Sequence, residues 1–269
     1  MPFASFSLLA EFEPAVGQEY WHCDMKRGFK RIRKKEPLVT ALLAQDTTPQ
    51  RIGLLAQQGV YEFHQHEQWL DRVNGVELIA TLLQLNQELP AVRDKVLQIL
   101  KSYHEKPVLR GKNSLKLNRG DEGIPSPIEL YRNKFIFKLF AAIDCIFLEA
   151  NGTLHILDLK TGKADFDPRQ GYIYLLAARN LYPKQKAIAS FYNVESCEWS
   201  DSITATEIQL DAIQSQLAGF AQKHELEKQR YRQNSAVFAE LFPPNSDPMR
   251  CQHCQFHPIC TFSTCEVSA

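Results

Sequence analysis

Two β-rich runs, "FIFKLFAAIDCIFLE" and "TLHILDL", stand on either side of the pair Asn151-Gly152. An Asn-Gly pair between apolar runs is a strong short-range signal for a β-hairpin, because both residues accept the left-handed backbone of a tight turn. This feature constrains the fold most, since it predicts two adjacent antiparallel strands in the middle of the sequence.

The segments after the hairpin alternate between helix and strand. "DPRQGYIYLLAARNLY" has helical spacing, "KAIASFYNV" has the composition of a strand, and a long helix is expected over residues 203–235. The order strand, strand, helix, strand, helix predicts an α/β core around a mixed sheet. Because 44% of the 269 residues are hydrophobic, the chain can bury a substantial core.

The pairing register of this hairpin decides where two acidic side chains point. A one-residue slip turns every side chain of a strand to the other face. A two-residue turn would pair Ala150 with Thr153 and send Asp144 to the face opposite to that of Asp158. A three-residue loop would pair Glu149 with Thr153 and place Asp144 directly across from Asp158. Only the second register brings the two carboxylates together.

Two facing carboxylates repel each other unless a cation lies between them, and a divalent ion with oxygen ligands suits that place. In the stretch "ILDLKTGK", Lys160 shares a strand face with Asp158. With Mg or Mn held by Asp144 and Asp158, Lys160 would orient or help deprotonate an attacking water and offset charge on a phosphate. The alternative is a salt bridge at a strand end, with Asp158 and Lys160 simply paired.

The spacing of these residues resembles that of the PD-(D/E)xK phosphodiesterase superfamily. Asp158, in "DLK" followed by "TGK", comes fourteen positions after Asp144, which more closely resembles the G-x-x-D and D-x-K-T-G motifs of the RecB-like exonuclease branch. Ala141 stands where that branch usually has glycine. The resemblance implies a restriction-endonuclease-like core, with a central mixed sheet flanked by helices, and a metal-dependent nuclease.

Gln170 and Tyr174 in "QGYIY" lie one helical turn apart, on the first expected helix after the D-x-K strand. This Q-x-x-x-Y spacing also resembles the RecB-like branch, in which the pair contacts DNA and supports the catalytic lysine. The alternative is an ordinary amphipathic helix, with Tyr174 in the core and Gln170 at its edge. The resemblance therefore implies a catalytic set of Asp144, Asp158, Lys160, Gln170 and Tyr174.

Four of the seven cysteines lie near the C-terminal end of the sequence. A reducing cytoplasm favours metal binding or burial over disulfides. Cys251, Cys254 and Cys260 have the spacing C-x2-C-x5-C, and three thiolates need a fourth ligand to complete a tetrahedral site or a cluster. The sequence offers four candidates for this ligand: Cys23, His253, His257 and Cys265.

Iron-sulfur members of the RecB-like family, including AddB-type helicase-nuclease subunits and CRISPR-associated exonucleases, have three cysteines with this spacing after the nuclease core and one far before it. The resemblance implies a 4Fe-4S cluster held by Cys23, Cys251, Cys254 and Cys260, which would join the N-terminal segment to the C-terminal tail. Zinc, bound by the three cysteines with His257 or Cys23, is the alternative, because spacing does not separate the two metals.

RecB-like nucleases often carry a G-x-x-x-H motif on an early helix, where the histidine is a further metal ligand. In "GVYEFHQH", His64 follows Gly59 by five residues instead of four. We expect His64 to be this ligand, with Glu62 and His66 as competitors and Glu129, just before the first strand, as another candidate.

The run "KRGFKRIRKK" concentrates positive charge in a chain whose formal net charge is zero. Such a run suits contacts with nucleic-acid phosphates, although a solvated helix face has the same composition. Seven basic residues are predicted to bind nucleic acid: Lys26, Arg27, Lys30, Arg31, Arg33, Lys34 and Lys35.

Composition divides the chain into four segments. Residues 1–37 hold the basic run and Cys23, 38–127 form a helical arm and a linker, 128–235 form the nuclease core, and 236–269 form a C-terminal cysteine-cluster segment. The N-terminus lacks the basic region of a secretory signal, and no run approaches the ~18 apolar residues of a transmembrane helix. We therefore expect a cytoplasmic protein without membrane association.

Together these observations predict a metal-dependent deoxyribonuclease that uses Mg or Mn. We expect it to act as an exonuclease or on DNA ends and single strands, in repair, recombination or defence. The sequence has no P-loop motif, so a helicase or another repair or CRISPR subunit would be a separate partner. Two alternatives stay open: a non-catalytic DNA-binding or structural subunit of such a complex, and a zinc-binding interaction module.

Overall fold

The computed structural model of the chain describes residues 1–162, 166–245 and 247–262. The chain folds into two compact units. The first unit holds Met1–Asp46, Glu129–Lys138 and the chain from Ser215 onward, and the second holds Thr47–Ile128 and Leu139–Gln214. The four contiguous segments expected from composition stay a prediction.

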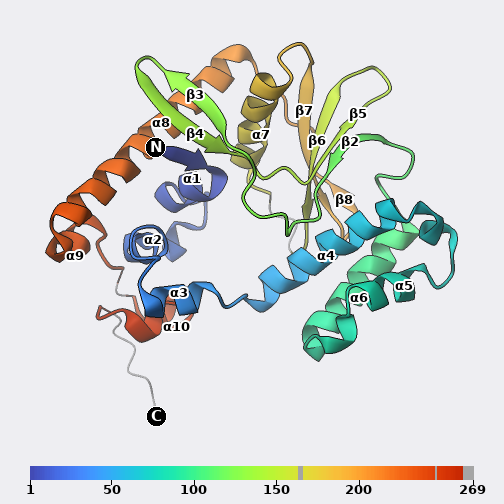
Figure 1. Ribbon diagram of the computed structural model, residues 1–269, viewed down its shortest axis with the longest axis horizontal. Helices are drawn as coiled ribbons and strands as arrows, with labels where there is room; N and C mark the ends of the chain where they lie inside the picture. Colours follow the sequence, from blue (N-terminus) through green and yellow to red (C-terminus); the bar gives the residue numbers. More distant parts are fainter. Residues whose placement is uncertain (163–165, 246, 263–269) are drawn as a thin grey trace. The chain divides into compact units, whose positions relative to one another are not determined.

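A five-stranded sheet in the order β2-β5-β6-β7-β8 forms the centre of the second unit (Figure 1). Its strands are β2 (Asn113–Leu117), β5 (Cys145–Leu148), β6 (Leu154–Lys160), β7 (Ala187–Asn193) and β8 (Glu198–Trp199). β6 and β7 run parallel, whereas the other three neighbouring pairs are antiparallel. The predicted α/β core with a mixed sheet is therefore confirmed.

The helices of the second unit begin at recognisable start signals. Thr47 and Gln50 form a capping box at the first turn of α4, and prolines occupy the first positions of α6 and α7. The helices are α4 (Thr48–Gln65), α5 (Gly75–Leu82), α6 (Pro90–Glu105) and α7 (Pro168–Leu181), with 3₁₀ turns η2 (Glu67–Asp71) and η3 (Leu85–Gln87).

Strand β6 is covered on both faces. Leu157 faces an apolar cluster that includes residues of α4 and α6, such as Val60 and Ile99. Its neighbour Asp158 points to the opposite face, where Tyr174 of α7 contacts it. Because α7 also connects β6 to the parallel strand β7, it fixes the sheet face that carries the acidic residues.

The hairpin between β5 and β6 adopts the three-residue register. The Glu149 N–H donates to the Thr153 carbonyl at 2.9 Å, and Gly152 has a left-handed φ of +80°. Cys145 is therefore paired with Leu157. Asp144, one position before Cys145, lies across from Asp158 on the same side of the sheet.

Most residues of a second, three-stranded sheet, in the order β1-β4-β3, belong to the first unit. Its strands are β1 (Phe3–Ser5), β3 (Ile128–Arg132) and β4 (Phe135–Phe140). Helices and 3₁₀ turns accompany it: α1 (Phe6–Phe12), η1 (Glu19–Trp21), α2 (Asp24–Arg31), α3 (Pro37–Leu43), the later turns of α8 (Glu207–Gln233), η4 (Ser235–Val237), α9 (Phe238–Leu241), α10 (Pro248–Gln252) and η5 (His257–Ile259). The long helix expected over 203–235 corresponds to α8.

An aromatic core joins the N-terminal and C-terminal ends of the first unit. Phe29 of α2 packs on Phe238 and Phe256, with ring centroids 5.4 and 5.3 Å apart. Gly28 permits this approach, because a Cβ atom there would lie 2.7 Å from the ring of Phe242. Within the described ranges, no helix combines the length and apolar character needed to cross a bilayer.

Candidate functional site

Asp144 and Asp158 face each other at the ends of β5 and β6. Asp158 is 3% exposed, whereas Asp144 keeps part of its surface in solvent. The Asp144 carboxylate accepts hydrogen bonds from the Leu159 N–H at 2.8 Å and from Gln57 Nε2 at 3.0 Å. These two donors fix the orientation of the first acid.

The electrostatics of the pair disfavour two negative charges. Burial, followed by the charge of Asp158, raises the pKa of Asp144 to about 8, although the Leu159 N–H and Lys160 act in the other direction. At neutral pH, Asp144 therefore tends to hold a proton. A divalent cation that replaces this proton would relieve the same repulsion.

Lys160 shares the strand face of Asp158, as its i+2 spacing predicted. Its Nζ atom lies 2.7 Å from Asp158 Oδ2 and donates to Gln170 Oε1 at 3.0 Å. The ammonium is partly exposed, with 33% of the side-chain surface accessible. The salt bridge that sequence analysis kept as an alternative is thus present, and it coexists with the facing carboxylates.

Gln170 and Tyr174 extend from α7 to the other oxygen of Asp158. Gln170 Nε2 donates to Oδ1 at 2.9 Å, and the Tyr174 hydroxyl lies within hydrogen-bond reach of both Oδ1 and the Ala142 carbonyl. Burial, together with the nearby carboxylates, raises the pKa of Tyr174, so its hydroxyl stays protonated. The structure therefore gathers all five residues of the predicted catalytic set.

Gln57 is a residue of this site that sequence analysis missed. It lies on α4 and donates from Nε2 to Asp144 and to the Asn118 carbonyl, the latter at 3.2 Å. Gly53 and Gln57 have the spacing of a G-x-x-x-H motif, with glutamine in place of histidine. That pattern could have identified the position.

His64 lies two helical turns beyond Gln57, and its ring nitrogen is 2.6 Å from the Tyr103 hydroxyl. Burial lowers the pKa of His64. Its competitor Glu62 pairs with Arg119 at 2.9 Å and lies 3.9 Å from His66, and Glu129 is exposed on β3. Over residues 1–162, 166–245 and 247–262, no three His, Cys, Asp or Glu side chains are placed to hold a metal ion, so His64 does not join the acidic pair.

The acidic pair nevertheless fits a hard divalent cation that keeps water ligands. Asp158 Oδ2 is buried and accepts no hydrogen bond from the described residues, so its only described partner is the Lys160 ammonium. Mg in particular binds through one or two carboxylates and retains several waters. Asp144 and Asp158 would hold such an ion.

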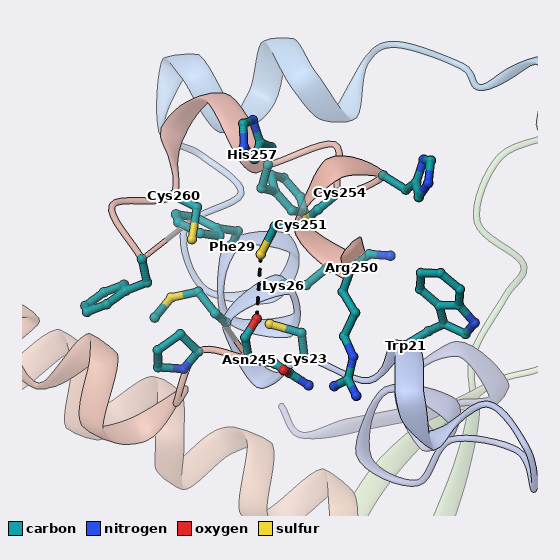
Figure 2. A pocket seen from close by; sticks show the side chains of 15 residues that line it. Trp21, Cys23, Lys26, Phe29, Asn245, Arg250, Cys251, Cys254, His257 and Cys260 are labelled. Carbon is teal, nitrogen blue, oxygen red and sulfur yellow. Dashed lines mark hydrogen bonds between the residues drawn. The ribbon is translucent and has the colours of Figure 1, made fainter. Parts of the chain in front are cut away.

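The four predicted cluster cysteines line one pocket of the first unit, with a volume of about 90 Å³. Figure 2 shows Cys23, Cys251, Cys254 and Cys260 around it, although they come from distant parts of the sequence. Thiolate donors suit both iron-sulfur clusters and zinc, but the described atoms do not form a closed coordination set.

The other proposed ligands differ in position. His253 and His257 also line the cysteine pocket, and His257 Nε2 is buried without a hydrogen-bond partner in the described chain. Cys265 lies outside the described residues. The identity of the fourth ligand stays a prediction.

The basic run differs from its predicted role at several positions. Arg27 is 3% exposed and pairs with Glu227 and Asp24, so it is a core residue that cannot reach a phosphate from this position. The remaining arginines and Lys30 also have acidic partners: Arg31 and Lys30 pair with Glu11, and Arg33 pairs with Glu36. Exposed lysines of the run are Lys26, Lys34 and Lys35. The local positive charge is therefore smaller than the sequence count indicates.

A family model described as "PD-(D/E)XK nuclease superfamily" matches residues 14–261. Among solved structures, one titled "Crystal structure of SSO0001" aligns over 92% of this chain and 97% of its own, at 14% identity and a TM-score of 0.36. That score is too low to carry an argument about this chain. No curated protein matches the sequence. The family match is to the superfamily as a whole, so the RecB-like branch stays a prediction.

Proposed function

The chain belongs to the PD-(D/E)XK nuclease superfamily, and we propose that it hydrolyses phosphodiester bonds of DNA at the site formed by Asp144, Asp158 and Lys160. One observation carries this proposal: two facing carboxylates share a sheet face with a lysine ammonium 2.7 Å from one of them. The superfamily typically uses Mg or Mn, which fits the two carboxylates. We further propose DNA ends or single strands as substrates, and a role in repair, recombination or defence.

Each residue of the site has a defined task in this proposal. A bound Mg or Mn ion would activate water and offset charge on the reacting phosphate. Asp144 and Asp158 would hold that ion, and Gln57 would keep the Asp144 carboxylate turned toward it. Lys160, whose charge is partly exposed, would orient the attacking water and stabilise the developing negative charge.

Gln170 and Tyr174 are positioning residues. Both hold Asp158 Oδ1, and Gln170 Oε1 also accepts from Lys160 Nζ at 3.0 Å. Because these contacts come from consecutive turns of α7, the helix links the orientation of the acid to that of the lysine. A contact of this pair with the substrate strand is part of the proposal.

The first experiment is degradation of end-labelled single- and double-stranded DNA with Mn, comparing the wild type with Lys160→Ala. We expect the wild type to cleave and Lys160→Ala to lose activity by at least about 100-fold, since it removes an electrostatic contact to the reacting phosphate. Lys184→Ala removes an exposed lysine after α7 and is the matched control. Equal cleavage by the wild type and Lys160→Ala would refute the assigned site, and no cleavage by folded, metal-loaded wild type would favour a non-catalytic DNA-binding subunit.

We also propose that Cys23, Cys251, Cys254 and Cys260 hold a structural 4Fe-4S cluster, with zinc as the alternative. Their common pocket supports this, because it brings four thiols from both ends of the chain together. Anaerobically purified protein should be brown and contain about four iron atoms per chain, and Cys23→Ser should lose most of that iron. A colourless protein with one zinc atom would support the zinc alternative instead.

A further inference from the structure

An open pocket of about 700 Å³ in the second unit includes Phe191, whose ring centroid lies 5.6 Å from the ammonium of the catalytic Lys160. Aromatic and aliphatic side chains form part of its walls, and its rim carries two exposed carboxylates. The residues that matter here are Phe166, Phe191 and Ile203 on the walls, with Glu198 and Asp201 at the rim. Pockets that bind small planar groups commonly combine this size with apolar walls and a few polar groups.

The aromatic wall is continuous with the acidic site. Phe191 of β7 is paired with Asp158 of β6, and the Lys160 ammonium lies 5.6 Å from the Phe191 ring centroid. Phe166 stacks on Phe191, with ring centroids 5.2 Å apart and an interplanar angle of 6°. Phe191 is 1% exposed, whereas Phe166 is only half-buried, so Phe166 presents the accessible surface of the stack.

Local hydrogen bonds hold this wall in place. The Phe191 N–H donates to Ser200 Oγ at 2.9 Å, and the Ser200 N–H donates to the Phe191 carbonyl at 2.9 Å. Phe166 directly precedes Asp167, which caps α7 by accepting from the Arg169 N–H. A stacking surface that is already fixed loses little conformational entropy when a ligand binds.

The charge of the rim decides which part of a nucleic acid fits. Glu198 and Asp201 are exposed carboxylates, which repel a phosphate and accept hydrogen bonds from the amino groups of a base. Aromatic side chains stack on bases irrespective of sequence. On the basis of the proposed nuclease function, we propose that this pocket binds an unpaired nucleobase of the strand being cut, stacked on Phe166 next to the scissile phosphate.

This inference gives a physical reason for a preference for single strands or frayed ends. A base inside a duplex is stacked and paired on both sides, so it enters such a pocket only after it has been unstacked. A single-stranded end presents that base without this cost. The pocket therefore selects the substrate, while Asp144, Asp158 and Lys160 carry out the hydrolysis.

The test uses full-length protein and short single strands with 2-aminopurine at successive positions from the end, in EDTA, where no hydrolysis takes place. Wild type should quench the probe at one or two positions. Phe166→Leu keeps apolar packing on Phe191 but removes the flat ring, and it should weaken binding by about 5- to 100-fold and abolish the quenching. Phe166→Trp should restore both.

Phe135→Leu is the matched control, because Phe135 is also a half-buried ring that stacks on a buried one, Phe137. It should bind the strand as the wild type does. Quenching that is equal in the wild type and Phe166→Leu, or absent from the wild type, overturns the inference. Because this assay needs no catalysis, it is independent of the cleavage assay, so a pocket that stays empty and a protein that does not cut DNA are separate results.

Discussion

Replacing Asp144 with asparagine changes how the stability of the protein depends on pH. Burial and the charge of Asp158 raise the pKa of Asp144 to about 8 in the folded protein. In an unfolded chain the pKa of an aspartate is about 3.9. Between these two values the folded protein holds a proton that the unfolded chain has lost, so the free energy of unfolding falls as pH rises.

The magnitude follows from this linkage. A tenfold change in a protonation constant corresponds to about 1.4 kcal/mol, so the full shift would remove about 2 kcal/mol between pH 6 and pH 8. Because Asp144 keeps part of its surface in solvent, we expect about 1 to 2 kcal/mol. The loss levels off above about pH 8, where Asp144 is ionised in both states.

Urea unfolding in EDTA at pH 6 and pH 8, followed by far-UV circular dichroism, measures this effect. Asp144→Asn keeps an oxygen that can accept from the Leu159 N–H and has no proton to lose, so its stability should vary less across this range than that of the wild type. Asp94→Asn, at an exposed position of α6, is the matched control and should follow the wild type. Parallel pH dependence of the wild type and Asp144→Asn would refute the argument that Asp144 holds a proton near neutral pH.

Three further substitutions test the site and the fold. Tyr174→Phe removes a hydroxyl within reach of Asp158 and Ala142, so the Mn concentration for half-maximal cleavage should rise by about 10-fold, measured by titrating Mn in the cleavage assay. Gly75→Ala should destabilise the protein by more than about 2 kcal/mol, because its Cβ would lie 2.1 Å from the Trp69 carbonyl oxygen. Gly219→Ala should stabilise it by about 0.5 to 1 kcal/mol, because a Cβ at this position of α8 meets open space. The urea unfolding assay measures both.

The hairpin shows how far the sequence determines the site. Asn151-Gly152 predicted the turn correctly but allowed two registers, because both faces of β6 are buried and the apolar pattern does not separate them. The free energy of burying Asp144 decides between the two registers, and it depends on tertiary packing. In the other register Asp144 would share the face of Leu157, which belongs to the apolar cluster, and burial of a carboxylate there is unfavourable.

Residues whose roles depend on distant partners were predicted less well. The sequence predicts that Arg27 binds nucleic acid, because its main partner, Glu227, is two hundred positions away along the chain and local sequence does not indicate the pair. On α4, His64 and Gln57 lie on the same side of the helix, two turns apart, so helical spacing alone did not decide which one reaches the acidic pair. In both cases tertiary contacts, which the local sequence does not show, determined how the residue is used.

The two oxygens of Asp158 have different surroundings, and this asymmetry connects the fold to the proposed chemistry. Gln170 and Tyr174 both contact Oδ1, so helix α7 holds the carboxylate in one orientation. Oδ2 is left with an ion pair to Lys160 and no hydrogen bond from the described residues. Since Lys160 has a long, flexible side chain, a divalent cation that supplies the compensating positive charge would replace its ammonium at Oδ2 while the carboxylate stays fixed. The Lys160 ammonium lies 5.6 Å from the Phe191 ring centroid, next to the pocket where the proposal places a base beside the scissile phosphate.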